Sequence, residues 1–202
     1  MKTMPNILRS LALGCLVLSQ SSLRAADAAD VKWETLFNGK DLTGWVGVHD
    51  VTFVVTNDNL RLVKGMGWLR TEKEYGDFNL ELEWCPLVEK YDSGIFFRCG
   101  KDGKPWPDNG WQINLRYDML CGLVRGYKKV VPAETEKKPV KEWAKLRLEV
   151  KGKKVTCFVN GEKQWEFNEL DRDTGYIGIQ AEDRAFDFRN FRVQALGSAA
   201  AK

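Results

Sequence analysis

Hydrophobic and polar residues alternate along much of this chain with the two-residue period of β-strands. The clearest run is 78–84, where Phe, two Leu and Trp share one phase and Asn and two Glu take the other. Comparable short runs, separated by turn residues, are 51–55, 60–63, 94–98, 110–116, 143–150, 155–160, 163–167 and 175–182. No segment keeps a helical period. We therefore predict an all-β fold of antiparallel strands packed as a sandwich.

Segments without alternation predict the connections. Residues 65–70 are interrupted by glycines and are expected to be irregular, and 101–109 forms a Gly/Pro loop that contains Trp106. Residues 120–126 are expected to be a short strand or a turn. The dipeptide Asn160-Gly161 between two strands predicts a tight β-hairpin turn.

The last two predicted strands lie in 175–196 and are joined by Glu182, Asp183 and Arg184. Within the second strand, the two phenylalanines at 186 and 188 share one phase, whereas the apolar residues from 191 onward take the opposite phase. A slip of one residue inside an apolar strand indicates a β-bulge near Arg189 and Asn190.

The N-terminus has the pattern of a secretory signal peptide. Basic Lys2 and Arg9 precede a short apolar core at 11–18, and small residues follow it. We assign 1–25 to the signal peptide, 26–34 to a lead-in, 35–196 to one domain and 197–202 to a tail. The protein is thus expected in the periplasm or outside the cell, and we expect no membrane anchor because the apolar core is too short.

Charge and cysteine content narrow the possible partners. The leader carries Lys2, Arg9 and Arg24 and no acid, so the remaining chain has 28 basic and 28 acidic residues. A neutral chain argues against a nucleic-acid partner. Four cysteines follow the leader, and either free buried thiols or disulfides are compatible with their spacing: Cys85, Cys99, Cys121 and Cys157.

If the strands share one sheet, their polar phases collect on one face. That face would combine carboxylates, amides and arginines, which are the groups that hydrogen-bond sugar hydroxyls. We therefore predict a carbohydrate ligand. The predicted substrate-binding residues are Arg98, Trp106, Gln112, Asn114, Gln180 and Arg189.

Carboxylates on this face could carry acid/base chemistry on glycosides. Glu83 and Glu182 are the predicted catalytic pair, facing each other across the sheet. The alternative is that the glutamates form ordinary surface ion pairs with Arg98 and Arg116. The only histidine, His49, lacks the sequence context of a nucleophile triad and is assigned to a loop.

Several stretches carry distinctive motifs: LFNGKDLTGW at 36–45, Asp77-Phe78 with Glu83, Ser93-Gly94-Ile95 with Arg98, Trp111-Gln112-Ile113, Gly178-Ile179-Gln180 and Phe188-Arg189-Asn190. Together these stretches resemble the 3-keto-disaccharide hydrolase family, and the resemblance runs from about Leu36 to Leu196. The resemblance implies a concanavalin A-like jelly roll of two antiparallel sheets, exported and acting on glycosides oxidised at C3. It also implies base-promoted chemistry, in which a carboxylate removes the C2 proton, and a possible divalent metal as cofactor.

The sequence departs from the family pattern near the predicted site. The family usually has acids two residues before and three residues after the strand glutamine, where this chain has Gly110 and Leu115. After the last glutamine the family often has Asp-His-Gly, and here Ala181-Glu182-Asp183 stands instead.

Three functions therefore remain open. The leading one is a hydrolase or lyase of 3-keto-disaccharides. The others are a non-catalytic lectin-like domain of the same fold and a structural protein of the envelope. The sequence leaves open the sugar, its linkage, the metal and the oligomeric state.

Overall fold

The computed structural model describes residues 32–132 and 138–197, and these fall within one compact unit. The signal peptide predicted at 1–25 and the end of the tail lie outside the described residues. The described residues form strands and no helix, and this part of the chain therefore contains no helix that could span a membrane. The strands are β1 (Glu34–Thr35), β2 (Trp45–Thr56), β3 (Asn59–Tyr75), β4 (Phe78–Pro86), β5 (Gly94–Cys99), β6 (Trp111–Asn114), β7 (Leu123–Arg125), β8 (Lys128–Val131), β9 (Ala144–Lys151), β10 (Lys154–Val159), β11 (Glu162–Phe167), β12 (Gly175–Glu182) and β13 (Phe186–Ala195).

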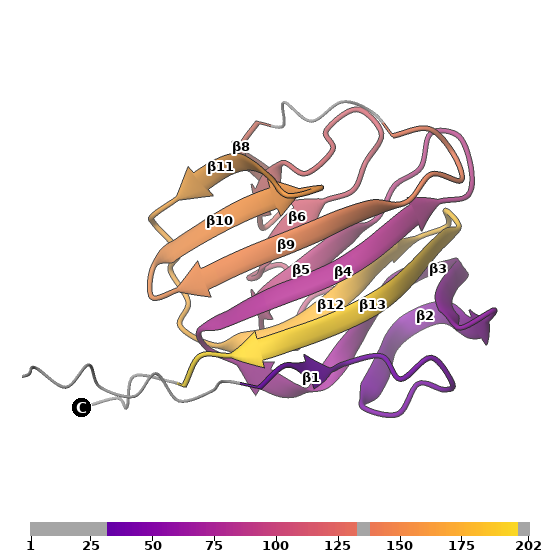
Figure 1. Ribbon diagram of the computed structural model, residues 1–202, viewed down its shortest axis with the longest axis horizontal. Helices are drawn as coiled ribbons and strands as arrows, with labels where there is room; N and C mark the ends of the chain where they lie inside the picture. Colours follow the sequence, from indigo (N-terminus) through magenta and orange to yellow (C-terminus); the bar gives the residue numbers. More distant parts are fainter. Residues whose placement is uncertain (1–31, 133–137, 198–202) are drawn as a thin grey trace, which may run out of the picture. The chain divides into compact units, whose positions relative to one another are not determined.

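All strand pairs are antiparallel and follow the order β11-β10-β9-β4-β13-β3-β12-β5-β6-β7-β8, with β2 added to β3 and β1 to β13. Strand β3 takes part in both halves of this order. Its first residues, around Leu60 to Leu62, pair with β13, and the part from Met66 to Tyr75 pairs with β12. Figure 1 shows β9, β4 and β13 in one layer, with β5 and β6 in a second layer behind them.

We call β9, β10, β11, β4 and β13 the β4 layer, and β12, β5, β6, β7 and β8 the β12 layer. One apolar cluster contains residues from both layers, including Leu82 and Trp84 of β4 and Ile177 and Ile179 of β12. Because strand side chains alternate, the residues between these core positions point away from the core. The two layers therefore present two separate outer faces.

Local signals in the sequence explain two details of the sheets. Asn160 and Gly161 have φ angles of 52° and 89° between β10 and β11, which confirms the predicted hairpin turn. The register of β13 against β4 shifts between Arg189 and Arg192, and Asn190 has a φ angle of 52°. The predicted β-bulge is thus confirmed, and it turns these side chains away from the regular alternation.

The prediction of short strands around an irregular segment at 65–70 was wrong. Gly65 and Gly67 lie inside β3, which pairs with β2 from Trp45 to Thr56. A Cβ added at Gly65 would lie 2.1 Å from the carbonyl oxygen of Asp50, and one at Gly67 would lie 2.2 Å from that of Val48. These glycines permit a close approach of two backbones and do not end the strand.

The four cysteines of the described residues are buried and free. Burial raises the pKa of the Cys157 thiol well above its ordinary value. Such thiols behave as small apolar side chains of the core.

Candidate functional site

The structure divides the predicted polar face into two. Glu81, Glu83 and Arg189 lie on the outer face of the β4 layer, where Glu83 is opposite Arg189 on one side and Lys145 on the other. The predicted residues Gln112, Asn114, Gln180 and Glu182 belong to the β12 layer. Since the apolar core separates the two outer faces, the prediction of a single groove was wrong. Glu83 and Glu182 do not face each other.

Arg98 is also not available to a ligand. Its side chain is fully buried, and its guanidinium donates to the carbonyl oxygens of Gly76, Gly152 and Arg172 and to the carboxylate of Asp77, at 2.6 to 3.1 Å. The φ angle of 48° at Arg98 breaks the alternation of β5 and turns this side chain inward. We therefore correct its predicted role from substrate binding to holding three loops together.

The β12 layer holds a group that we call the carboxyl–amide cluster: Asp92, Gln112, Asn114, Arg116, Gln180 and Glu182. Gln112 Nε2 donates to Gln180 Oε1, and Gln180 Nε2 donates to Glu182 Oε2 at 2.7 Å. A Cβ at Gly94 would lie 2.1 Å from Gln112 Nε2, so this glycine gives the amide room to lie across β5. The amides are thereby fixed in one orientation beside Glu182.

Asp92 completes this cluster. In the antiparallel ladder Ile95 lies opposite Ile179, and continuing that register for three residues brings Asp92 beside Glu182. Ser93 Oγ donates to the Gln180 carbonyl oxygen at 2.8 Å, which fixes the same alignment beyond the end of β5. Asp92 was not among the predicted site residues, because the strand was predicted to begin at Gly94. The signal was present, since Asp92 shares the phase of Gly94.

The two carboxyl groups of the cluster have raised pKa values. Burial, with a further contribution from the charge of Glu182, raises the pKa of Asp92 to about 7, and Arg116 opposes this shift. Burial also raises the pKa of Glu182, against the opposing charges of Arg116 and Arg184. Two neighbouring carboxyl groups of this kind can divide the roles of proton acceptor and proton donor near neutral pH.

Trp106 closes one end of the cluster. Its indole Nε1 donates to the carbonyl oxygen of Ala181 at 2.9 Å, between Gln180 and Glu182 in sequence. The half-buried ring packs on a small apolar group that includes Trp68 and Phe96. His49 lies in β2 and not in a loop as predicted, and its Nε2 lies 2.9 Å from the Gly103 carbonyl oxygen, so it contacts the Trp106 loop.

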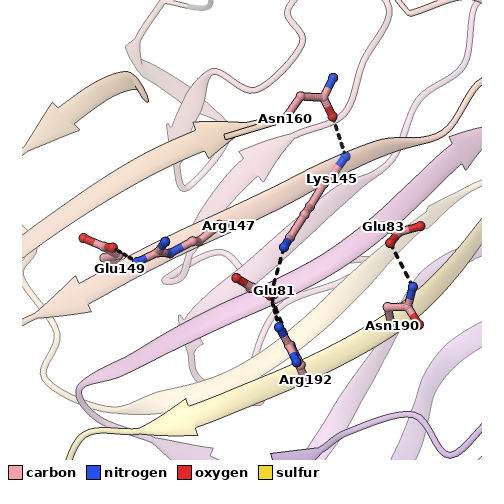
Figure 2. A network of polar contacts seen from close by, with 8 residues as sticks. All are labelled: Glu81, Glu83, Lys145, Arg147, Glu149, Asn160, Asn190 and Arg192. Atoms are coloured by element: carbon pink, nitrogen blue, oxygen red, sulfur yellow. Dashed lines mark hydrogen bonds and ion pairs between the residues drawn. The ribbon is translucent and has the colours of Figure 1, made fainter. Parts of the chain in front are cut away.

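The β4 layer holds a different group, the ion-pair cluster: Glu81, Glu83, Lys145, Arg189, Asn190 and Arg192. Figure 2 shows Glu81 between Lys145 and Arg192, at 3.1 and 2.6 Å, and Glu83 beside Asn190. Glu83 accepts hydrogen bonds from Asn190 at 2.8 Å and from Arg189 at 2.7 Å. A cavity of about 710 Å³ lies over these residues.

The ion-pair cluster is poorly suited to proton transfer. Burial alone would raise the pKa of Glu83, but the Asn190 and Arg189 contacts outweigh it and leave this pKa below its ordinary value. A carboxylate that is strongly stabilised in its charged form is a weak base. The predicted catalytic role of Glu83 is therefore not supported by its surroundings, although the cavity lies here.

A divalent metal does not fit the side chains of the carboxyl–amide cluster. Within 32–132 and 138–197, no group of three or more His, Cys, Asp or Glu side chains could hold a metal ion. The two carboxyl groups of the cluster also face the positive charges of Arg116 and Arg184, which compete with a cation.

Three solved structures with similar folds are distant in sequence. A protein from Parabacteroides distasonis, provisionally described as a glycosyl hydrolase, aligns with a TM-score of 0.68 and 22% identity over 82% of this chain and 94% of its own. Carbohydrate binding module CBM66 from Bacillus subtilis aligns with a TM-score of 0.65 and 17% identity, over 75% of this chain and 96% of its own. A Bacillus subtilis protein of unknown function with a galectin-like fold aligns with a TM-score of 0.66 and 15% identity, over 82% of this chain and 95% of its own. At these identities the likeness establishes the all-β fold alone.

Comparison at the level of sequence is more specific. No curated protein matches the chain. Residues 32–194, however, match the family model of the 3-keto-alpha-glucoside-1,2-lyase-like domain, which covers nearly all of the described residues. This match confirms the resemblance drawn from the sequence motifs, and the chain belongs to the 3-keto-alpha-glucoside-1,2-lyase-like domain family.

Proposed function

We propose that this protein cleaves glycosides oxidised at C3, with the carboxyl–amide cluster of the β12 layer as its active site. The observation that carries the proposal is the pair of neighbouring carboxyl groups with raised pKa values, Asp92 and Glu182. Family membership supports the substrate class. The distant likeness to a carbohydrate-binding module is compatible with a sugar ligand.

The chemistry follows from the acidity of the substrate. A ketone at C3 acidifies the hydrogen on C2, and the Glu182 carboxylate removes that proton. The electron pair of the C2–H bond forms the C1–C2 double bond as the C1–O bond breaks. Asp92, still partly protonated near neutral pH, gives its proton to the departing oxygen. Addition of water to the resulting enone completes a net hydrolysis.

The remaining side chains of the cluster would orient the sugar. Gln112 and Gln180 are buried and bonded to each other, so their remaining donors and acceptors have fixed directions. Trp106 offers the exposed part of its ring beside them, and sugar rings commonly pack on such surfaces. Arg116 would stabilise negative charge that develops on the ketone oxygen.

A second candidate function is sugar binding without catalysis. At the two positions where relatives usually carry acids, this structure has no room for a carboxylate. A Cβ at Gly110 would lie 1.8 Å from Cys99 Sγ, and Leu115 is fully buried in the core. The protein would then be a lectin-like domain that holds its ligand at the same face.

Turnover of 3-keto-disaccharides by purified variants distinguishes the two candidates. Asp92→Asn and Glu182→Gln should each lower kcat by about 10² to 10⁴, the usual contribution of a general acid or base. Glu83→Gln should keep wild-type turnover because its carboxylate lies on the other layer. Full activity in both Asp92→Asn and Glu182→Gln would refute the active-site assignment. Binding of disaccharide without any turnover by the wild type would instead favour the lectin-like function.

We further propose that the chain is exported and adopts the jelly-roll connectivity of concanavalin A-like proteins. The signal-peptide pattern predicted at 1–25 supports export, and the sheet order supports the connectivity. Intact-mass analysis of the protein from a fractionated cell tests the first point, since removal of the leader should leave a chain that begins near residue 26.

A further inference from the structure

The cavity of the β4 layer lies on a different face from the proposed active site and has walls of its own. Its floor is formed by β4 at 81–83. One wall is the β13 bulge at 189–192, and the other consists of the β2–β3 turn at 57–59 with the N-terminal segment near Asn38. Its volume of about 710 Å³ lies in the range of small-molecule sites.

The charged groups of the cavity are held in fixed positions. Only 11% of the Glu81 side chain and 25% of the Glu83 side chain are exposed, and each carboxylate has two donors. The guanidinium of Arg189 lies 3.9 Å from the centre of the Trp143 ring, and that of Arg192 lies 4.6 Å from the centre of the Trp33 ring. Such stacked and paired side chains offer hydrogen bonds at little further entropic cost.

The lining is balanced in charge. Its cationic side chains are Lys145, Arg189 and Arg192, and its anionic ones are Asp58, Glu81 and Glu83. The three cations are paired with Glu81 and Glu83, and Asp58 brings the formal charge of the lining to zero, so the site offers no net attraction to an anion or a cation. A neutral ligand with many hydroxyl groups matches this lining, because each hydroxyl can both donate to a carboxylate and accept from a guanidinium.

The β2–β3 turn contributes amide groups that the fold itself does not use. The side chains of Asn57 and Asn59 line the cavity, and within the described parts of the chain they make no hydrogen bond. The ion pairs explain how the β4 layer is held together, but they do not account for these amides. Amides of this kind are typical partners of sugar hydroxyls.

From the volume, the fixed polar groups, the charge balance and the unused amides, we infer that this cavity is a second saccharide-binding site, for a neutral mono- or disaccharide unit. It binds sugar without transforming it, since Glu83 is a poor base. The site does not depend on the chemistry proposed for the β12 layer, because the core lies between the two faces.

The test is an NMR titration of the isotope-labelled mature chain with unoxidised trehalose, sucrose and cellobiose. At least one sugar should shift the side-chain signals of Asn57, Asn59 and the Arg189 Nε–H group. The double variant Asn57→Gly/Asn59→Ala should weaken binding at the cavity about five- to tenfold, the loss of one or two hydrogen bonds. Glycine suits position 57 because its φ angle is 50°.

A matched control is Arg147→Gln/Glu149→Gln, an ion pair on the same outer face that does not line the cavity. This pair, labelled in Figure 2, should leave the affinity for sugar unchanged. Both double variants should turn over 3-keto-disaccharides like the wild type. If turnover is absent but the cavity signals respond to sugar, the proposed catalytic function fails and the second site stands.

The inference is overturned if none of the three sugars shifts the cavity signals at millimolar concentration. It is equally overturned if citrate or phosphate shifts them and sugars do not, because the site would then bind anions. An equal effect of both double variants on sugar binding would also refute it, since the loss would not be specific to the cavity.

Discussion

Asp92 provides a test of the proposed active site that needs no substrate. In the unfolded chain this carboxyl group loses its proton near its ordinary pKa of 3.8, whereas in the folded protein it keeps the proton until about pH 7. Between these values the folded protein binds more protons than the unfolded chain. The free energy of unfolding should therefore fall as pH rises through this range. In Asp92→Asn the side chain cannot ionise, so this decrease in the free energy of unfolding should be absent.

The size of the effect follows from the shift. A difference of about three pKa units corresponds to about 4 kcal/mol at most. Asp92 remains partly exposed, and solvent screening reduces this to about 1–2 kcal/mol. For a domain of this size, that is roughly 2–8 °C in Tm. The variant should match the wild type at about pH 4 and be more stable by this amount at about pH 8.

Differential scanning calorimetry at several pH values measures the difference in stability, and an NMR titration of the Asp92 carboxyl carbon measures its pKa directly. A gain in stability of the same size at acid and alkaline pH would refute the reasoning, because an effect of packing alone would not depend on pH. An Asp92 carboxyl that titrates near its ordinary value would refute it as well.

Two further predictions concern the fold. Arg98→Met should destabilise the protein by about 3–5 kcal/mol, because three carbonyl groups lose their charged donor and the Asp77 carboxylate keeps only the Gly152 backbone N–H. A Tm within 2 °C of the wild type in thermal unfolding, on the order of 1 kcal/mol or less, would contradict this. Gly65→Ala should cost more than Gly161→Ala in urea unfolding, because both residues have positive φ but only the alanine at 65 meets another backbone, at 2.1 Å. The cost at 161 should be about 1–2 kcal/mol, the strain of a left-handed residue, and equal costs at both positions would contradict the close approach of β2 and β3.

Much of the fold could be predicted because strand period and turn chemistry are local properties of a sequence. The alternation in 78–84 depends only on neighbouring residues, as does the Asn160-Gly161 turn. The bulge near Arg189 was visible as a slip of phase. Each of these local preferences is found in the folded protein because it agrees with the packing of the core.

The site was harder to predict because the alternation along a strand indicates which residues point outward, but it does not indicate which layer the strand belongs to. Glu83 and Gln180 both take the polar phase of their strands, yet they lie on opposite sides of the core. Arg98 follows the alternation in sequence, but a single positive φ angle reverses its direction. Asp92 shares the phase of Gly94 but lies before the start of its strand, so its place beside Glu182 depends on the register of β5 against β12. Tertiary pairing decides all three cases.

The continuity of β3 sets how the protein loses its structure. Its first residues belong to the ladder with β13 and the rest to the ladder with β12, so a single stretch of backbone is shared by both layers. Neither layer can separate from the other while β3 stays hydrogen-bonded at both ends. Amide protons of β3 should therefore exchange with solvent only when the whole domain opens, whereas the outermost strands β8 and β11 can fray independently.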